Sequence, residues 1–330
     1  MENAVIVRKE NKTLDIFKAI ACVIVTTAHL PSICPDPLTD MYFNQWFLRF
    51  CVPFFFVSSG YFYYKSRDKK KTLARMGWLF ALSYVLYLPL VLEGAGDLHS
   101  VISKLRWNLV FGYEHLWYLS AALEGMVIWF VLEKIPGVNR LFHKLGIPAS
   151  VLLFLVGVLL GEYHKVIGSG PVYALGELLA VFGGPRNVVF MGFPLLMFGG
   201  AVAQYEEKIR RIPVLALLAA WVILRALAYW ECTYLYETLG SGIRLDLSFF
   251  GCWPAVVLFA LSFRFQIPVP EGFAKLLRRM AEYVYVLHPL IAMLLMRYTP
   301  MAPIPLWLTT IVLCSGIYVL LEKQFVVKRK

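Results

Sequence analysis

The sequence predicts an all-α protein, a polytopic transmembrane helical bundle of about ten spans. Its 330 residues are 59% hydrophobic and only 16% charged, with a mean hydropathy of +0.66. One soluble core could not hide that much apolar side chain, so the bilayer must act as the solvent. Apolar stretches close to the roughly 20 residues that cross a hydrocarbon core recur along nearly the whole chain. Only helices and closed barrels satisfy all backbone hydrogen-bonding groups in lipid, and these runs are too long for barrel strands. They are therefore predicted to be helices.

Ten spans follow from the hydropathy and from the positions of helix breakers. In chain order they lie near residues 14–34, 44–64, 77–93, 116–133, 148–163, 188–204, 213–230, 247–263, 281–296 and 306–322. The first span is expected to stay in the membrane, because Asp15 and Lys18 lie in its first turns and no small-residue cleavage site follows. No internal repeat or long linker interrupts the chain, which predicts one integral-membrane domain over residues 1–330.

Basic residues predict the orientation of the bundle. The net charge of +11 would suggest nucleic-acid binding in a soluble protein, but here Lys and Arg lie in short connections between apolar runs. We therefore expect the bilayer, and no nucleic acid, as a partner. Most of the 32 Lys and Arg residues fall on one side of the ten-span arrangement, in segments 8–18, 65–75, 134–144, 208–211, 264–279 and 323–330. The positive-inside rule then places both termini in the cytoplasm.

Three longer connections would lie on the outer side of the membrane. They fall near residues 94–115, 164–187 and 231–246. Glycine, proline, tyrosine and charged residues are frequent in them, a composition that suits a lid or a substrate vestibule.

The cysteines argue against metal or redox chemistry. None of the six is part of a C-x-x-C pair, and most lie inside apolar runs. Structural zinc sites and disulfide frameworks need the spacings that are missing here. We therefore predict no metal ligands.

The first span carries the candidate catalytic residues Asp15, Lys18 and His29. On a straight α-helix Lys18 and His29 lie within about 20° of one face and about 16 Å apart along the axis, and Asp15 can pair with Lys18 there. Ionisable groups in a span are costly and mark a substrate or proton path by default, and histidine can take a proton from a hydroxyl near neutral pH. The alternative is that Asp15 and Lys18 only mark the cytoplasmic boundary and that His29 is an interfacial histidine bonded to a carbonyl.

The second span ends in a notch of small residues and a basic loop. Ser59 and Gly60 would let a helix or a ligand approach the backbone closely, and helix packing is the simpler interpretation. The loop that follows could anchor the topology or bind the phosphates of a nucleotide-bearing donor. Its candidate phosphate ligands are Lys65, Arg67, Lys69 and Arg75.

Later spans contain candidate substrate or oxyanion positions. His115 opens the fourth span, beside the Trp117 and Tyr118 that an aromatic belt would supply in any case. His288 lies in the middle of the ninth span, just before a proline, and is either a satisfied core group or a member of the site. Arg186 begins the sixth span on the outer side.

In order and spacing these residues resemble the acyltransferase family 3 membrane proteins, particularly the membrane domain found in vancomycin-resistance serine racemases. The resemblance covers essentially the whole chain. The motifs that carry it are Asp15-Ile-Phe-Lys18 followed by His29, Pro53-Phe-Phe-Phe-Val-Ser-Ser59-Gly60-Tyr-Phe, His115-Leu-Trp-Tyr-Leu, Arg186-Asn187, and Tyr285-Val-Leu-His288-Pro289.

The resemblance implies transfer of an acyl group, usually acetyl, from cytoplasmic acyl-CoA to a cell-envelope acceptor, commonly a glycan hydroxyl. It implies a bacterial inner membrane, with acyl-CoA as a co-substrate and no permanently bound cofactor. The family's motif of a basic residue, ten residues and a histidine maps onto Lys18 and His29, which makes His29 the catalytic base. Lysine stands here where many relatives have arginine, which keeps the charge but loses the bidentate geometry.

Other functions and routes stay open from the sequence. His29 could remove the hydroxyl proton or be briefly acylated, with Ser59, Tyr118 or His115 steadying the oxyanion. A proton-coupled transporter or flippase would instead line a substrate path with the ionisable residues, although the two halves of the chain show no matching broken spans. A membrane sensor domain without catalysis is the third candidate. The acceptor, the acyl chain and the oligomeric state are not predicted.

Overall fold

The computed structural model describes residues 11–327, with side chains described as far as residue 321. In this part of the chain every regular element is helical, which confirms the all-α prediction. The helices are α1 (Lys12–Val25), α2 (Pro37–Tyr42), α3 (Cys51–Lys65), α4 (Lys69–Val91), α5 (Leu98–Phe111), α6 (Trp117–Lys134), α7 (Val138–Val158), α8 (His164–Ile167), α9 (Gly170–Val181), α10 (Phe193–Gln204), α11 (Glu206–Ile209), α12 (Val214–Leu239), α13 (Trp253–Leu261), α14 (Glu271–Tyr298) and α15 (Pro303–Val327). Short 3₁₀ or π turns extend or join several of them, at Thr26–His29, Phe43–Phe47, Leu48–Phe50, Glu114–Leu116, Leu159–Tyr163 and Val188–Gly192.

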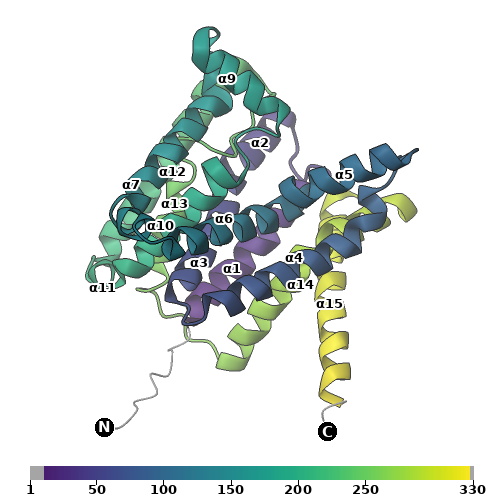
Figure 1. The fold of residues 1–330 in the computed structure, drawn as a ribbon. Helices are drawn as coiled ribbons and strands as arrows, with labels where there is room; N and C mark the ends of the chain where they lie inside the picture. Colours follow the sequence, from purple (N-terminus) through teal and green to yellow (C-terminus); the bar gives the residue numbers. More distant parts are fainter. Residues whose placement is uncertain (1–10, 328–330) are drawn as a thin grey trace, which may run out of the picture.

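Six of the described helical segments are long and apolar enough to cross a membrane, which confirms a helical membrane bundle. They are Lys69–Val91, Glu114–Lys134, Val138–Ile167, Val214–Leu239, Glu271–Tyr298 and Pro303–Leu321. The start of α1 and the end of α15 lie at the same end of the bundle, as an even number of spans requires (Figure 1).

The count of ten spans, the N-in and C-in orientation and the single domain over residues 1–330 stay predictions. Part of the charge bias behind the orientation rests on residues outside the described range. These are Arg8, Lys9, Lys328, Arg329 and Lys330.

Glycine permits the close crossing of α3 and α10 at the centre of the bundle. A Cβ atom on Gly60 would lie 1.9 Å from the carbonyl oxygen of Leu196, and one on Gly199 would lie 2.1 Å from that of Val57. Any side chain at either position would push the two backbones apart. The helix-packing interpretation of Gly60 is therefore correct.

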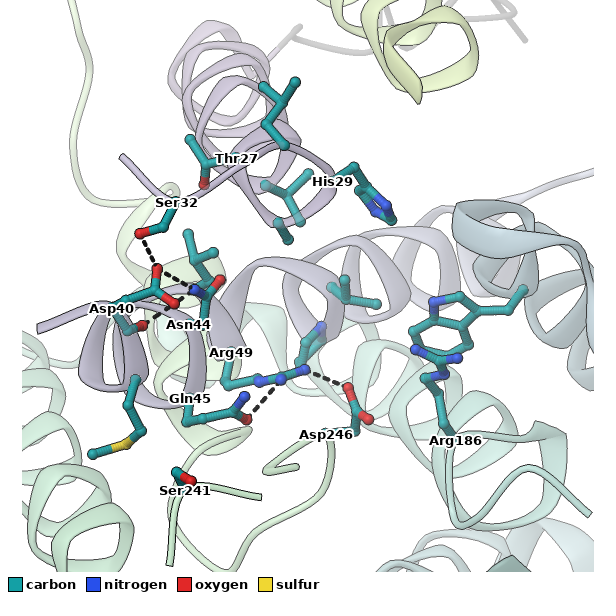
Figure 2. Close-up of a pocket in the computed structure, with 18 of the residues that line it drawn as sticks. Thr27, His29, Ser32, Asp40, Asn44, Gln45, Arg49, Arg186, Ser241 and Asp246 are labelled. Atoms are coloured by element: carbon teal, nitrogen blue, oxygen red, sulfur yellow. Dashed lines mark hydrogen bonds and ion pairs between the residues drawn. The ribbon is translucent and has the colours of Figure 1, made fainter. Parts of the chain in front are cut away.

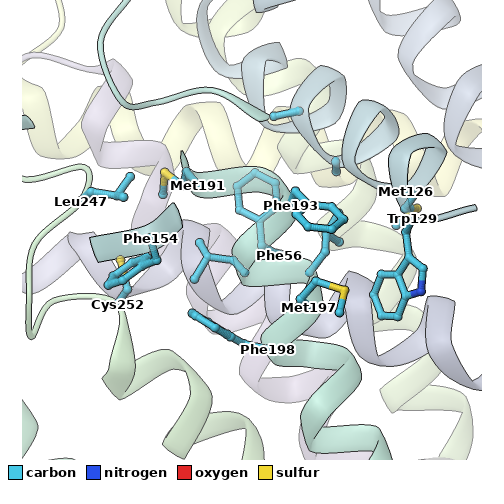
Figure 3. Close-up of a cluster of buried hydrophobic side chains, with 14 of the residues drawn as sticks. Phe56, Met126, Trp129, Phe154, Met191, Phe193, Met197, Phe198, Leu247 and Cys252 are labelled. Carbon is cyan, nitrogen blue, oxygen red and sulfur yellow. The ribbon is translucent and has the colours of Figure 1, made fainter. Parts of the chain in front are cut away.

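Large apolar side chains fill the core around this crossing (Figure 3). Phe56 of α3 belongs to one cluster with Trp129 of α6, Phe154 of α7 and Phe193 and Phe198 of α10, all nearly or fully buried. Such interlocked packing makes these helices a rigid scaffold. α1 packs between this scaffold and α14, and α14 in turn packs against α15.

The predicted span near 247–263 is wrong in extent. Only nine of its residues form a helix, α13, which is about 14 Å long and much shorter than a hydrocarbon core. Irregular backbone inside an apolar bundle needs partners from the protein. The fully buried Glu231 provides them, because its carboxylate accepts from the Phe249 and Phe250 N–H groups at 2.7 and 2.9 Å and from the Tyr163 hydroxyl at 2.8 Å.

Two of the predicted outer connections are largely helical. α5 occupies most of residues 94–115, and α8 and α9 together occupy most of residues 164–187. The Asp97 side chain caps α5 by accepting from the Ser100 N–H at 2.7 Å. The 14 residues of α5 and the 12 residues of α9 keep both helices below the length of a spanning helix.

Candidate active site

His29 is the last residue of a tightened turn at the end of α1. Residues 26–29 form a 3₁₀ turn, in which the Thr26 and Thr27 hydroxyls each donate to the carbonyl three residues earlier at 2.7 Å. The Trp307 indole N–H of α15 donates to the Thr26 hydroxyl at 2.9 Å. Two helices therefore fix the backbone that carries His29.

Three histidines from distant parts of the chain meet at this point. The ring centre of His29 lies 5.1 Å from that of His288 and 5.9 Å from that of His115, and the last two are 5.2 Å apart. His115 and His288 are almost completely buried. Within residues 11–327 no group of His, Cys, Asp or Glu has a geometry that could hold a metal ion.

The Tyr87 hydroxyl interrupts the backbone hydrogen bonding of α14 next to His288. Pro289 has no N–H to donate to the carbonyl four residues back. One residue later the Tyr87 hydroxyl bridges the ladder, because it donates to the Val286 carbonyl at 2.8 Å and accepts from the Leu290 N–H at 3.1 Å. Inserted groups of this kind distort a helix locally. Tyr87 of α4 therefore holds the part of α14 that presents His288.

The hydrogen bonds of His288 fix which nitrogen carries a proton. Its Nδ1 lies 2.8 Å from the Val284 carbonyl oxygen and 3.0 Å from that of Tyr285. Carbonyls only accept, so Nδ1 is the donor and Nε2 of the neutral ring holds a lone pair. This Nε2 is buried and has no hydrogen-bond partner among the described side chains and backbone. It is available to accept from His29 or from a ligand.

A strained turn places His115 at the start of α6. Gly112 has φ +72°, and a Cβ atom there would lie 2.3 Å from the backbone of Trp117. Glu114 also has a positive φ of 46°. Tyr285 donates to the His115 carbonyl at 2.6 Å, whereas neither ring nitrogen of His115 has a partner in the described part of the chain. The ring is thus buried and polar, with the Val286 backbone within its reach.

A wide pocket of about 550 Å³ opens beside His29 (Figure 2). Its polar lining consists of Thr27, His29, Ser32, Asp40, Asn44, Gln45, Arg49, Arg186, Ser241 and Asp246. Arg49 forms an ion pair with Asp246 and donates to the side-chain amide oxygen Oε1 of Gln45 at 2.6 Å. Arg186, Ser241 and Asp246 come from, or directly adjoin, the connections that the sequence assigns to a vestibule.

A second, narrow pocket of about 180 Å³ lies along α1 on the side of Lys18. Phe55, Ser59 and Tyr118 line it, with the Ser59 and Tyr118 hydroxyls 2.8 Å apart. Its lining also contains Cys22, Met76, Leu79, Leu119 and Tyr285.

Charged side chains surround the opening of the narrow pocket. Lys18 lies with its Nζ 4.4 Å from the centre of the Phe62 ring, and Asp15 pairs with Arg278 of α14 at 3.2 Å. Glu282 is within electrostatic reach of four cations. They are Lys18, Arg75, Arg278 and Arg279.

A small cavity of about 30 Å³, room for about one water molecule, lies between the two regions. His29 and Trp117 line both this cavity and the wide pocket. Phe55, Tyr118 and Tyr285 line both this cavity and the narrow pocket, and we call these three side chains the aromatic wall. Lys18 and His29 therefore face different pockets, one on each side of the aromatic wall.

The basic loop after α3 is partly engaged in ion pairs. Lys65 pairs with Glu206 at 3.1 Å, and Lys69 pairs with Glu133 at 2.5 Å. Arg67 and Lys69 line a separate surface pocket, away from the narrow one. Of the predicted phosphate ligands only Arg75 lies near the narrow pocket. The phosphate-binding role of this loop stays a prediction.

Apolar helices around two pockets, with histidines beside the aromatic wall between them, define a multi-pass membrane protein with a candidate active site in its core. The acyltransferase domain family matches residues 11–321, and the chain belongs to this family. The resemblance found in the sequence is thereby confirmed, and family membership supports acyltransferase activity.

Curated relatives include racemases from enterococci. The chain is 26% identical over 342 residues to an amino-acid racemase of Enterococcus faecalis, a match that covers 96% of this chain and 46% of the relative. It is 27% identical over 301 residues to a serine/alanine racemase of Enterococcus gallinarum, covering 85% and 40%. The chain thus spans less than half the length of these relatives. No solved structure matches it.

Proposed function

We propose that this protein is a membrane-embedded O-acyltransferase of the bacterial inner membrane. It would move an acyl group, most simply acetyl, from cytoplasmic acyl-CoA to a hydroxyl of a cell-envelope acceptor, with a glycan as the expected acceptor. The observation that carries the proposal is the position of His29, which lines the wide pocket and lies across the aromatic wall from the narrow one. Donor and acceptor would reach the same imidazole from opposite sides.

The charges around the narrow pocket support a donor with phosphate groups. Four cations, Lys18, Arg75, Arg278 and Arg279, gather around the carboxylates of Asp15 and Glu282 at the opening. Such a cluster attracts and orients phosphates. Arg75 and Arg278 lie toward the beginning of α4 and α14 and Lys18 at the middle of α1, and the predicted orientation places the beginning of all three helices in the cytoplasm. The apolar interior beyond them suits a thin chain that carries a thioester.

The proposed chemistry uses His29 as a general base. The acceptor oxygen attacks the thioester carbonyl carbon while His29 removes the hydroxyl proton. The carbon–sulfur bond then breaks, and the same proton passes to the departing thiolate, so that the products are an acyl ester and free CoA. His288 Nε2 would orient His29 by accepting its other N–H. The Tyr118 hydroxyl and the His115 ring are the candidate donors to the oxyanion. A transient acyl-His29 would give the same products.

Release of CoA tests this proposal. Purified protein in nanodiscs receives acetyl-CoA and a membrane glycan extract, and free thiol is measured over time. We expect turnover by the wild type and a loss of roughly 10²- to 10⁴-fold in His29→Ala. His99→Ala, which changes an exposed histidine on α5, is the matched control and should retain full rate. An active His29→Ala enzyme would refute the assignment of the base.

A transporter or flippase is the second candidate, and one observation favours it. Two pockets separated by the aromatic wall also suit a path that opens alternately to either side. Flux of labelled glycan across proteoliposomes that contain no acyl-CoA would support transport. An absolute requirement for acyl-CoA, with one CoA released per acceptor modified, would exclude it.

A further inference from the structure

The wide pocket has two opposite charged poles. In Figure 2 Asp40 lies on one side of the pocket, Arg186 on the other, and the Arg49–Asp246 pair between them. That central pair is neutral as a unit. The remaining charges of the lining are therefore one carboxylate and one guanidinium, held apart.

Asp40 presents a carboxylate oxygen to which no described protein group donates. The Ser32 hydroxyl and the Asn44 amide donate to its Oδ1 at 2.5 and 2.9 Å. Its Oδ2 has no hydrogen-bond partner, and the carboxylate has no ion-pair partner, among residues 11–321. The two neutral donors fix the carboxylate but leave its charge in place. A cationic group of a ligand in the pocket would supply the ion-pair partner that the Asp40 carboxylate lacks.

Arg186 forms the positive pole. Its guanidinium lies 5.1 Å from the centre of the Trp117 ring and makes neither a hydrogen bond nor an ion pair with the described side chains. The next residue, Asn187, caps the turn before α10 by accepting from the Val189 and Phe190 N–H groups at 2.9 and 3.1 Å. This cap anchors the backbone of Arg186. The charge of Arg186 is also within electrostatic reach of His29.

We propose that the acceptor is a hydroxyl compound that carries both an acidic group and an amine. Its carboxylate or phosphate would bind Arg186, close to His29, and its ammonium group would bind Asp40 across the pocket. The inference rests on the proposed acyl transfer and narrows its acceptor, because a neutral sugar would leave both poles unpaired. Loss of either charged contact should weaken acceptor use roughly 10- to 100-fold.

Four sugars with the same ring provide the test. Muramic acid carries both charges, glucosamine the amine alone, N-acetylmuramic acid the carboxylate alone, and N-acetylglucosamine neither. The kcat/KM of each is measured at neutral pH from acetyl-CoA-dependent release of CoA. We expect muramic acid to exceed each singly charged sugar by roughly tenfold or more, and N-acetylglucosamine to be the poorest.

Charge-removing variants assign each pole. Asp40→Asn should abolish the preference for muramic acid over N-acetylmuramic acid and retain the preference for muramic acid over glucosamine. Arg186→Gln should abolish the preference for muramic acid over glucosamine and retain the preference for muramic acid over N-acetylmuramic acid. Because these are ratios within one preparation, a partial loss of folded protein does not change them. Glu207→Gln and Arg106→Gln, at exposed positions outside the pocket, are the matched controls and should keep the wild-type ratios.

The outcomes separate this inference from the proposed function. Equal use of the four sugars, or a preference that both variants retain, would overturn the two-pole acceptor. Turnover with glycan extract but with none of the four sugars would also overturn it, and acyl transfer would stand. No release of CoA with any acceptor would refute the acyl transfer itself, and the inference with it.

Discussion

Removing the hydroxyl of Tyr87 tests how the fold holds His288. In Tyr87→Phe the Val286 carbonyl and the Leu290 N–H each lose a partner at the point where the fully buried Tyr87 packs against α14. A buried donor or acceptor left unsatisfied costs about 1–3 kcal/mol. The helix can avoid this cost only by closing the gap and forming its own bond between these two groups, which would displace His288. We therefore expect either a loss of stability of about 1–3 kcal/mol or a loss of activity.

Thermal unfolding in detergent and release of CoA measure the two quantities on the same preparation. Tyr84→Phe is the matched control, because it lies on the same helix and removes one bond, of 2.9 Å, to the Leu105 carbonyl. We expect Tyr84→Phe to cost less than about 1 kcal/mol and to leave the rate unchanged. A Tyr87→Phe protein as stable and as active as this control would refute the bridging role of the hydroxyl.

Three further predictions concern packing, donor binding and pH. Gly199→Ala should lower the free energy of unfolding by about 1–3 kcal/mol or prevent folding, whereas Gly77→Ala, with open space around it, should be nearly neutral. Equal unfolding midpoints for the two variants would contradict this prediction. Arg75→Gln should raise the KM for acetyl-CoA roughly tenfold. Lys65→Gln should raise it much less, because Glu206 already neutralises Lys65. A larger increase in KM for Lys65→Gln than for Arg75→Gln would instead place the phosphate site at the loop after α3. Partial burial raises the pKa of Glu206, but hydrogen bonds from Tyr61, Arg210 and Lys65 outweigh it and hold the pKa below its ordinary value of 4.5. The ionised form therefore stabilises the fold, so Glu206→Gln should be less stable than wild type above pH 4.5, and the difference in midpoint should shrink as the pH falls below that value.

Hydropathy predicted most of the helices because a spanning helix must be apolar over a minimum length. It failed where an apolar segment is not a continuous helix. Residues 247–252 are apolar enough for a span, yet their backbone is irregular and two of its N–H groups bond to Glu231. No local pattern in the sequence pairs Glu231 with a segment 18 or more residues away. The helices α5 and α9 were also missed, because they are short and lie between stronger signals.

The candidate site was predicted in part for a similar reason. His29, His115 and His288 stood out as ionisable groups in apolar runs, and the structure brings their rings together. Sequence gave no means to see that they would meet, since the contacts join segments far apart in the chain. Nor did it identify Tyr87 as a ladder bridge or Asp40 as a pole of the wide pocket, because a tyrosine in a span and an aspartate in a loop are ordinary.

Sidedness of the transfer tests the central claim most directly. Proteoliposomes of uniform orientation receive labelled acetyl-CoA on the side of Lys18, with the glycan acceptor confined to the opposite compartment. The account predicts labelled acceptor in that compartment, unlabelled CoA on the donor side, and neither in His29→Ala. Label that stays on the donor side, or intact acetyl-CoA that crosses the membrane, would contradict transfer through His29.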